Sequence, residues 1–468
     1  MPPSSTLLIT GASGYIASRL IPRLLALGYR VRCLARHPER LRRRAWFPQV
    51  EMIAGDLTRP ETLPAALQGV SAAYYLVHSM SAGRGYDRLD IESARNFAQA
   101  AREAGVAHII YLGGLADEHE DLALHMKSRI ESGAALREAG LPVTEFRAGI
   151  IVGPGSVSFE MIRFLAEQFP IMVGPVWLRH SAQPIATENV LDYLIAALTT
   201  PACRGQIIEI GGPDVMTYAE SMTRFAERRG LRRSMILLPF VPTWLMAFLI
   251  EKLTPISRSY ARSLVGGLRN DSVVRGHPPR DLFPDIAVLD YAESLRRALA
   301  DLRPETMERA WLDTGRDALE TKHEGMLIHY RRIESAAPAA TVFAAVCRLG
   351  GPDGWPAWHV LWRLRGWADR LLGGRGLAGR DDPLREGSQV DFYRVETLHE
   401  NLLCLRAELK APGEAWMEWQ ITPNGTGCML EQTAFFAPKG LAGFLYWALL
   451  GPIHRAVFER LAKALAQG

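Results

Sequence analysis

The sequence predicts an α/β fold built on a doubly wound parallel sheet, followed by a smaller α+β domain. Up to about residue 200, short apolar runs alternate with segments of helical period, and a glycine-rich loop follows the first run. After about residue 325, longer runs of alternating hydrophobicity replace this pattern. Alternation of strand and helix favours a parallel sheet with helices on both faces and right-handed crossovers.

Six apolar runs are expected to be the strands of the first part. They are Thr6–Thr10, Arg30–Ala35, Val50–Gly55, Ala72–Val77, His108–Gly113 and Val143–Gly153. Between them, residues 15–27, 62–68, 87–104 and 126–139 have apolar side chains at helical spacing. The order of these elements predicts a series of strand-helix-strand units.

A polar, charged stretch from about 300 to 325 is expected to form a helix and a linker. The predicted domains are therefore 1–305 and 326–468, joined by a linker at 306–325. The second domain is expected to contain a strand at 325–335, a helix at 337–349, strands within 388–437 and a last helix at Leu441–Gln467. The sequence PNGTG supplies a hairpin turn between two of these strands. An antiparallel sheet gripping the last helix is the simplest assembly.

The composition indicates a folded globular protein of two or three domains, since the chain has 468 residues. The net charge is +4 and the basic residues are scattered, so nucleic-acid binding is not indicated. The five cysteines lie far apart with no Cys-x-x-Cys pair, which predicts neither a disulfide framework nor a metal site. A cytoplasmic location fits this usage, with peripheral contact to the inner membrane as an alternative. No signal peptide is expected, because the first strand begins close to Met1.

One apolar stretch, Met235–Ile250, has to be considered as a possible membrane span. It is shorter than the ~20 residues that span a bilayer and contains Pro239 and Pro242. We expect a buried or interfacial helix here rather than a membrane span.

The loop TGASGYIA lies between the first strand and the first helix, with the pattern Gly-x-x-Gly-x-x-Ala at Gly11, Gly14 and Ala17. Small residues let the backbone approach a pyrophosphate, and the helix N-terminus presents free N–H groups to the anion. The context of strand before and helix after is the one this motif requires. The loop therefore predicts a dinucleotide cofactor, and a purely structural turn is the alternative.

The end of the second strand indicates which dinucleotide is bound. An acidic residue there would bind the ribose hydroxyls of NAD, but this chain has Ala35 and Arg36, followed by Arg40. A guanidinium fits the 2′-phosphate of NADP, so NADP is predicted, with NAD as the alternative. The alternative reading of Arg36 is a solvated basic turn. Asp56 follows the third strand, where it could accept from the adenine amino group or cap a helix.

On these residues the chain resembles the atypical short-chain dehydrogenase/reductase family, near NmrA-like regulators and the NADPH-holding subunit of respiratory complex I. The resemblance covers about residues 5 to 300, through TGASGYIA, LARHPERL, AGDLTRPETLPAAL, YLGGL, FRAGIIVGPGS and QPIATENVLDYL. It implies a Rossmann-type domain. The candidate cofactor-binding residues are Gly11, Ser13, Gly14, Tyr15, Ile16, Arg36, Asp56, Leu57, His78 and Ser79.

From about residue 325 the chain resembles the DUF2867 domain, which is similar to the lipid-binding helix-grip fold of the SRPBCC class. The stretches GGPDGW, VDFYRVE, AWMEW and GLAGFLYWALLGPIHRAVF show this resemblance. It implies a cavity between sheet and helix. Trp355, Trp358, Trp362 and Trp367 are spaced to form an aromatic wall for an apolar guest, although such stripes also form cores, and His454 is expected to be structural.

Active relatives implied by the resemblance use a Ser at the end of the fifth strand and a Tyr-x-x-x-Lys pair on the next helix. Here the strand ends in Gly113 and Gly114, while His125 takes the place of Tyr and Arg129 that of Lys. The spacing of four residues puts both on one helix face. The family's proton-transfer residues are therefore replaced, and the candidate catalytic residues are His125 and Arg129.

Three hypotheses for this pair remain open. His125 could be a substitute general acid and base beside Arg129. The pair could instead bind substrate or nicotinamide, while Lys127, Ser128 or Tyr111 matter for the chemistry. The site could also be catalytically silent, with the dinucleotide serving structure or sensing.

Other residues fall near the expected nicotinamide position. His78, Ser79 and Met80 follow the fourth strand, and residues 149–153 follow the sixth, at the carboxyl ends where open α/β sheets bind ligands. Arg147 could clamp a substrate oxygen or pair with Glu145. An apolar lip or a core is expected at Phe159, Met161, Ile162 and Phe164.

These features predict an NADP-dependent oxidoreductase acting on a hydrophobic carbonyl, enone or lipid-like compound, held partly by the second domain. Its partner is a small hydrophobic molecule. The alternative is a non-catalytic NADP(H)-binding protein that senses redox state or stabilises a membrane-associated assembly.

Overall fold

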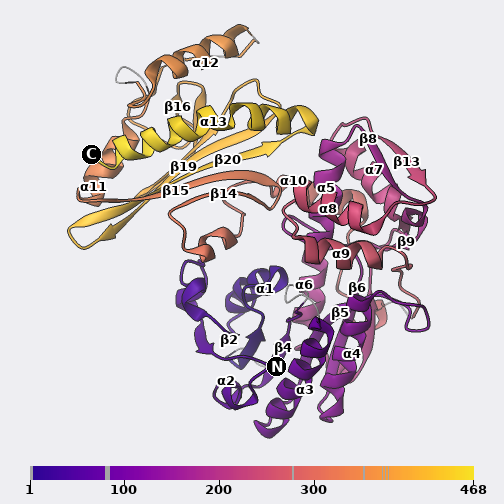
Figure 1. Cartoon of the computed structure of the whole chain (residues 1–468). Helices are drawn as coiled ribbons and strands as arrows, with labels where there is room; N and C mark the ends of the chain where they lie inside the picture. Colours follow the sequence, from indigo (N-terminus) through magenta and orange to yellow (C-terminus); the bar gives the residue numbers. More distant parts are fainter. Residues whose placement is uncertain are drawn as a thin grey trace. The chain divides into compact units, whose positions relative to one another are not determined.

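The computed structural model describes residues 4–79, 85–276, 279–350, 354–371, 373–374, 376–377 and 379–468. The chain divides into two compact units. Unit 1 comprises Met1–Ala166 with Pro170–Thr314, and unit 2 comprises Glu167–Phe169 with Gly315–Gly468. Figure 1 shows both units in colours that follow the sequence. Each unit is described by itself below.

Unit 1 is built on a sheet whose strands lie in the order β11-β6-β5-β4-β1-β2-β3, with every neighbouring pair parallel. The strands are β1 Thr6–Thr10, β2 Arg30–Ala35, β3 Glu51–Ala54, β4 Ala72–Tyr75, β5 Ile109–Gly114, β6 Val143–Ala148 and β11 Ile207–Ile210. The chain builds outward from β1 on one side and then on the other. The doubly wound parallel sheet predicted from the sequence is confirmed.

The helices pack on both faces of this sheet. They are α1 Tyr15–Ala26, α2 Pro64–Leu67, α3 Tyr86–Glu103, α4 Leu124–Glu138 and α6 Thr187–Ala196. Side chains alternate along β1, so Leu7 and Ile9 join the core under α1 and α6, whereas Leu8 joins the core under α3 and α4. Both faces of the strand are therefore buried, which explains its continuous apolar run.

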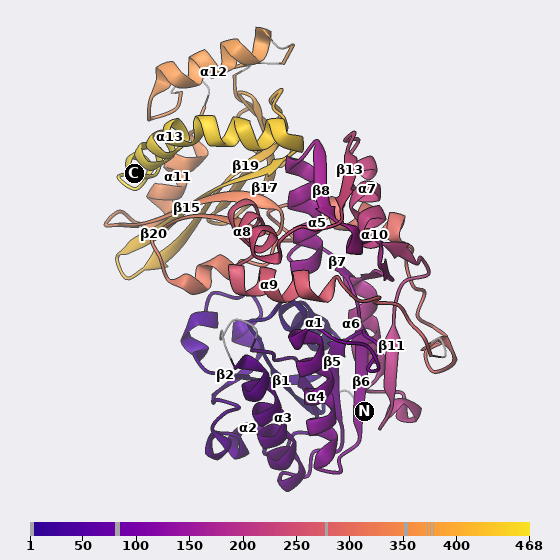
Figure 2. The ribbon, with the colours of Figure 1, turned by 45° about the vertical axis from the view of Figure 1, so that its right-hand side comes forward.

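The second half of unit 1 adds smaller elements beside the sheet. They are β7 Ile151–Val152, α5 Val157–Gln168, β8 Ile171–Pro175, β9 Ser181–Ala182, β10 Ile185–Ala186, β12 Met216–Thr217, α7 Tyr218–Arg228, β13 Ser234–Leu238, α8 Thr243–Leu253, α9 Arg258–Gly267 and α10 Tyr291–Ala300. Figure 2 shows α9 above the carboxyl ends of the central strands. This helix therefore covers the edge at which α/β sheets bind ligands.

Two expectations for unit 1 are wrong. The single strand predicted over 143–153 is split, because β6 ends at Ala148 and β7 pairs with β10 instead. The single helix predicted over 235–250 is also split, since residues 234–238 form β13, which pairs with β8. Proline has no N–H and a fixed φ, so Pro239 and Pro242 separate β13 from α8. Of α8, only Ala247 and Ile250 are buried.

Unit 2 is built on an antiparallel sheet in the order β14-β15-β20-β19-β18-β17-β16. Its strands are β14 Ala318–His323, β15 Met326–Ser335, β16 Gln389–Val390, β17 Tyr393–His399, β18 Leu402–Ala407, β19 Gly413–Asn424 and β20 Gly427–Pro438. Its helices are α11 Ala339–Cys347, α12 His359–Leu371 and α13 Gly440–Leu465. The antiparallel sheet with a long last helix across it is as predicted, and Figure 1 shows α13 along that sheet.

The hairpin of β19 and β20 turns at Gly425 and Thr426, within the predicted PNGTG turn. Gly425 has a φ of +60°, which glycine adopts without strain. The start of unit 2 differs from the prediction, since β14 lies inside the stretch 306–325 that reads as a linker. Its alternating polar and apolar residues pair with β15, so the sheet begins at Ala318.

Among the residues that the structure describes, α13 is the one helix long and apolar enough to cross a membrane, judged by length and composition only. A long core helix of a soluble protein passes the same test. The C-terminal half of α13 packs Val457, Phe458 and Leu461 into the core of unit 2.

Candidate functional site

The glycine loop has the geometry of an anion cradle. Gly11 has a φ of +73°, and a Cβ at this position would lie 2.6 Å from the carbonyl oxygen of Leu76, so the loop contacts the end of β4 directly. The Gly14 N–H donates to the Gly11 carbonyl at 2.8 Å. Gly14 caps α1 without a side-chain hydrogen bond, and the first turn contains no acidic residue. The start of α1 therefore has the glycine-rich sequence and the uncharged first turn that suit a phosphate.

The side chains around the loop shape it. Ser13 is exposed, and Ile16 packs against the core. The Tyr15 hydroxyl lies 2.8 Å from Oγ1 of Thr187, and the Arg19 guanidinium lies 4.1 Å from the centre of the Tyr15 ring. Tyr15 is therefore fixed by protein contacts, and its part in a cofactor site is to form a wall.

The end of β2 presents a free cation. Arg36 is exposed, and its side chain makes no hydrogen bond or ion pair within the described part of the chain. Burial acts to raise the pKa of Asp56, but hydrogen bonds from Thr58 and the charges of Arg36 and Arg59 leave that pKa below its usual value. Asp56 and Arg36 are thus electrostatic neighbours.

Asp56 is also part of a local turn. Its Oδ1 accepts from the backbone N–H of Thr58 at 3.0 Å and from the Thr58 hydroxyl at 2.9 Å, the pattern of an Asx turn. Leu57 is buried, and its carbonyl accepts from Nδ2 of Asn96 at 3.0 Å. These bonds fix the loop after β3, and the turn role foreseen for Asp56 as an alternative is present.

A second group of side chains gathers at the ends of β4 and β5. His78 follows β4, while His125 and Arg129 lie on α4. Nδ1 of each histidine and Nε of Arg129 are buried without a hydrogen-bond partner among the described residues. Burial, followed by the charge of Arg129, lowers the pKa of His125 to about 3. Burial, then Arg129 and then His125, lowers the pKa of His78 to about 3 as well. Both imidazoles are therefore neutral at pH 7.

Glycines make room for this group, which we call the His-Arg cluster (His78, His125 and Arg129). A Cβ at Gly114 would lie 3.1 Å from Cδ of Arg129, and a Cβ at Gly267 on α9 would lie 2.6 Å from Cε1 of His125. The Gly that stands where the family has Ser thus admits the Arg129 side chain.

The ring of Tyr260, also on α9, lies 6.2 Å from that of His78 in an edge-on arrangement. Together with Gly267, this contact shows that α9 closes one side of the His-Arg cluster.

Asp90 organises the same region and was missed by sequence reasoning. It is buried on α3 and accepts from the Ser79 N–H at 2.6 Å and from the Ser128 hydroxyl at 3.0 Å. Burial raises the pKa of Asp90, against the opposing hydrogen bonds of the two serines. Ser93 and Phe97 share its buried face, so an acidic residue on the apolar stripe of that helix was the available signal.

The other candidates for the chemistry are occupied or distant. Lys127 is exposed and lies 3.8 Å from Glu131. The Tyr111 hydroxyl donates to the carbonyl of Arg129 at 2.8 Å, and Ser128 is held by Asp90. Met80 lies outside the described residues. Among the residues that the structure describes, the His-Arg cluster thus keeps buried polar atoms without hydrogen-bond partners at this sheet edge.

Arg147 and the predicted apolar lip both have structural roles. Arg147 is buried, and its guanidinium donates to Glu145 and to Glu118 at 2.6 Å each, so it pairs rather than clamps a substrate. The apolar lip is core, since its predicted members are all buried: Phe159, Met161, Ile162 and Phe164.

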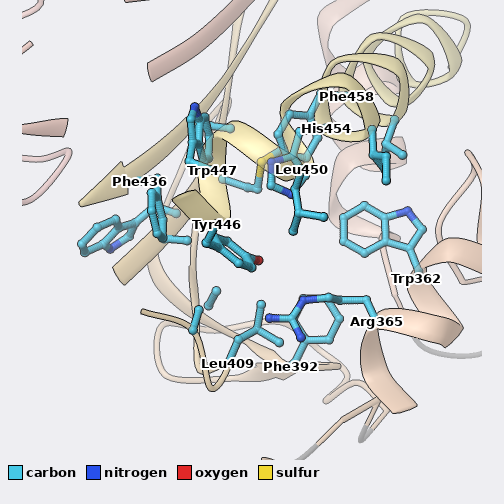
Figure 3. Close-up of a pocket in the computed structure, with 18 of the residues that line it drawn as sticks. Trp362, Arg365, Phe392, Leu409, Phe436, Tyr446, Trp447, Leu450, His454 and Phe458 are labelled. Atoms are coloured by element: carbon cyan, nitrogen blue, oxygen red, sulfur yellow. The ribbon is translucent and has the colours of Figure 1, made fainter. Parts of the chain in front are cut away.

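Unit 2 contains a cavity of about 410 Å³ bounded by α12, the sheet and α13. Figure 3 shows Trp362 and Arg365 entering from α12, and Tyr446, Leu450 and His454 from α13. The prediction that four tryptophans together form an aromatic wall is wrong. Trp355 and Trp362 stack at 4.2 Å in the interior, whereas Trp358 and Trp367 are 45% and 60% exposed because they lie on the outer side.

Comparison with known families matches each unit separately. Residues 11–151 match the family model described as NAD(P)H-binding, and residues 323–461 match that described as protein of unknown function DUF2867. The chain joins an NAD(P)-binding domain to a DUF2867 domain. The first match contains the glycine loop, the end of β2 and the His-Arg cluster.

Curated relatives match the NAD(P)-binding domain and are reductase-like or assembly proteins. A ceramide reductase of Caulobacter vibrioides is 29% identical over 241 residues, 49% of this chain and 73% of the relative. A photosystem II assembly factor Ycf39 of Trieres chinensis is 28% identical over 223 residues, 44% of this chain and 64% of the relative, less than two thirds of its length. An NAD(P)H azoreductase of Xenophilus azovorans is 26% identical over 216 residues, 46% of this chain and 70% of the relative.

Solved structures share the fold of this domain. Triphenylmethane reductase of Citrobacter sp., complexed with NADP(H), has a TM-score of 0.51 at 19% identity and covers 62% of this chain and 99% of its own. An NADPH-dependent quinone oxidoreductase of Escherichia coli has a TM-score of 0.51 at 18% identity and covers 63% of this chain and 99% of its own. The predicted pairing of an NAD(P)-binding domain with a DUF2867 domain is confirmed.

The residues present fit NAD(P). The absence of a side chain at Gly11 lets the loop lie directly against the end of β4, and α1 begins without an acidic residue that would repel a pyrophosphate. The candidate positions Gly11, Gly14 and Arg36 lie on the loop after β1 and the end of β2, while His78 and Ser79 lie after β4.

Proposed function

We propose that the protein is an NADP(H)-dependent oxidoreductase acting on a hydrophobic carbonyl, enone or lipid-like compound. The observation that supports it most is the His-Arg cluster, with buried nitrogens that lack partners at the carboxyl ends of β4 and β5. Buried polar atoms without partners are rare in folded proteins, so a bound molecule that supplies acceptors accounts for them. The relatives named as reductases support the same class of reaction.

We propose NADP(H) rather than NAD(H) as the coenzyme because of the residues at the end of β2. Arg36 is exposed and unpaired within the described chain, and Ala35 replaces the carboxylate that would bind the ribose hydroxyls. A guanidinium beside a 2′-phosphate forms charge-assisted hydrogen bonds. Arg40, also exposed, adds positive charge nearby.

His125 has a positioning role in this proposal rather than a proton-transfer role. With a pKa of about 3, its imidazole is neutral at pH 7 and is far from the range in which general acids and bases work best. A neutral imidazole holds one hydrogen bond to a substrate oxygen. Arg129 provides the positive charge that stabilises negative charge developing on that oxygen. The coenzyme, when bound, supplies the hydride, and the accompanying proton comes from water.

The test is loss of the NADPH absorbance band when hydrophobic carbonyls, enones and quinones are added to the full chain. We expect turnover with some of them, reduced at least about tenfold in Arg129→Gln because a charge-stabilising contact is lost. Lys127→Gln, on the same helix but exposed, is the control and should retain activity. NADPH binding without turnover of any of these compounds would contradict the proposal that the protein is an oxidoreductase.

A non-catalytic NADP(H)-binding protein is the second candidate, as a redox sensor or an assembly factor. It is favoured by the glycines where the family has Ser and by the His in place of Tyr. The named assembly factor among the relatives points the same way. Tight NADPH binding with no turnover, together with a change in thermal stability between NADPH and NADP⁺, is the outcome this candidate predicts.

A further inference from the structure

The cavity of unit 2 is almost wholly apolar, with a single charged side chain. The residues described as lining it include no Asp, Glu, Lys, Asn, Gln, Ser or Thr, and Arg365 is the one formal charge among them. Its volume of about 410 Å³ lies in the range of small-molecule sites. A cation in such surroundings selects for a guest with one negative charge.

Arg365 has no hydrogen-bond or ion-pair partner in the described part of unit 2, although two arginines of the sheet do. Arg394 pairs with Glu408 at 2.7 Å, and Arg406 pairs with Glu414 at 2.9 Å.

The acidic residue one turn from Arg365 on α12 is already used. Oδ1 of Asp369 accepts from the Lys410 N–H at 2.8 Å, and its Oδ2 accepts from the Gly376 N–H at 3.0 Å. Asp369 is fully buried and both of its oxygens accept from backbone N–H groups, and no ion pair joins it to Arg365 among the described residues.

Neutral polar groups accompany this cation. The Tyr446 hydroxyl and the Arg365 guanidinium are both directed into the cavity in Figure 3. Burial, then the charges of His329 and Arg365, lowers the pKa of His454 to about 4, so its imidazole is neutral at pH 7. Nδ1 of His454 is buried without a partner in the described chain. The polar set is thus one cation with neutral hydrogen-bonding groups.

We propose that this cavity binds an amphiphile with a carboxylate head group. Arg365 holds the carboxylate, Tyr446 donates to it, and the apolar part lies along Leu450, Phe436 and Val457. The proposal rests on the apolar-ligand part of the proposed function and specifies its head group.

A carboxylate is favoured over a phosphate monoester by charge. The planar guanidinium matches a carboxylate in a bidentate fork, and its single positive charge balances one negative charge. A second negative charge would be buried without a partner, at a high cost. The structure therefore specifies a monoanion with a long apolar part, such as a fatty acid.

The experiment titrates laurate, dodecanol, methyl laurate and dodecyl phosphate into the full-length protein. Binding is followed by tryptophan fluorescence, because Trp362 and Trp447 line the cavity. We expect laurate to bind more tightly than the alcohol and the ester by at least about tenfold, the effect of one charge-assisted pair, and more tightly than the phosphate.

Variants then test the named residue. Arg365→Gln should weaken laurate by at least about tenfold and leave dodecanol within about twofold, since only the charged head loses its partner. Arg363→Gln, exposed on the same helix, should change neither. Circular dichroism checks that both variants are folded.

Several results would overturn the proposal. They are no binding of laurate, equal affinity for the acid and the alcohol, tighter binding of dodecyl phosphate, or equal weakening of both ligands by Arg365→Gln. NADPH titration of the same samples separates the two claims. Laurate binding without NADPH binding refutes the oxidoreductase alone, and the reverse refutes the carboxylate site alone.

Discussion

The Tyr111 hydroxyl donates a 2.8 Å hydrogen bond to the carbonyl oxygen of Arg129, which ties the end of β5 to the middle of α4. This bond is partly buried, and it holds α4 where His125 and Arg129 reach the ends of the strands. Tyr111→Phe removes the donor and keeps the ring. We expect a loss of about 1 kcal/mol in the free energy of unfolding, measured by urea denaturation, because the carbonyl of Arg129 loses its hydrogen-bond donor. Unchanged stability would show that the bond does not hold α4.

Gly11→Ala should abolish or strongly weaken NADPH binding, because a Cβ would meet the Leu76 carbonyl at 2.6 Å and the φ of +73° disfavours a side chain. Gly69 is the matched control, with a φ of +70° and nothing within 4 Å of an added Cβ. Gly69→Ala should cost about 1 kcal/mol of backbone strain and leave binding unchanged. Fluorescence titration with NADPH measures both. Equal effects in the two variants would refute a cradle at Gly11.

Arg36→Gln should lower the affinity for NADPH by about tenfold or more and leave the affinity for NADH unchanged, because only NADPH has the 2′-phosphate. Competition titrations with the two coenzymes measure the ratio. Arg42→Gln, exposed farther along the same segment, is the control. A fall in affinity for both coenzymes would place Arg36 at the pyrophosphate, and no change for either would place it outside the site.

Acid should destabilise unit 1 through its buried histidines. His125 has a pKa of about 3 in the folded protein, against an ordinary value of 6.5. Below pH 6.5 the unfolded chain therefore binds more protons than the folded one, and stability falls as the pH drops from 6.5 toward 3. His125→Gln should flatten this dependence, whereas His119→Gln, at an exposed position, should not. Urea denaturation at a series of pH values tests it, and parallel curves for all three proteins would contradict the burial of His125.

Arg44 joins η1 (Pro38–Leu41) to residues 308–313 through a buried ion pair. Its Nε and Nη2 donate to Asp313 at 3.0 and 2.6 Å, and Nη1 donates to Glu308. Arg44→Met removes the buried guanidinium that pairs with Asp313, so we expect a loss of about 3 kcal/mol or more in the free energy of unfolding. Arg42→Met, on the surface, should change little. Similar melting temperatures for the two variants would refute the stabilising role of this ion pair.

The doubly wound parallel sheet and the glycine loop were predictable from local signals. Strand and helix periods alternate from Thr6 to Ala148, and Gly11 has a positive φ, a backbone conformation that few other residues adopt. The family resemblance and the four-residue spacing together predicted His125 and Arg129 as a pair, and the structure has both in the first half of α4.

Features that depend on tertiary contacts were not predictable. Asp90 and its serines come from three separate segments, and nothing local pairs them. The strand β13 exists because β8 lies beside it, so its apolar residues read equally as helix. Arg365 looks like any surface arginine until α12 and α13 enclose it, and the outward turn of Trp358 and Trp367 follows from the same packing.

Calorimetric titration of the full chain with NADPH and with NADH tests most directly whether the protein binds NADP(H). We expect NADPH to bind, with an affinity for NADH lower by about tenfold or more, because NADH has no 2′-phosphate for Arg36 to contact. No heat with either coenzyme would contradict it.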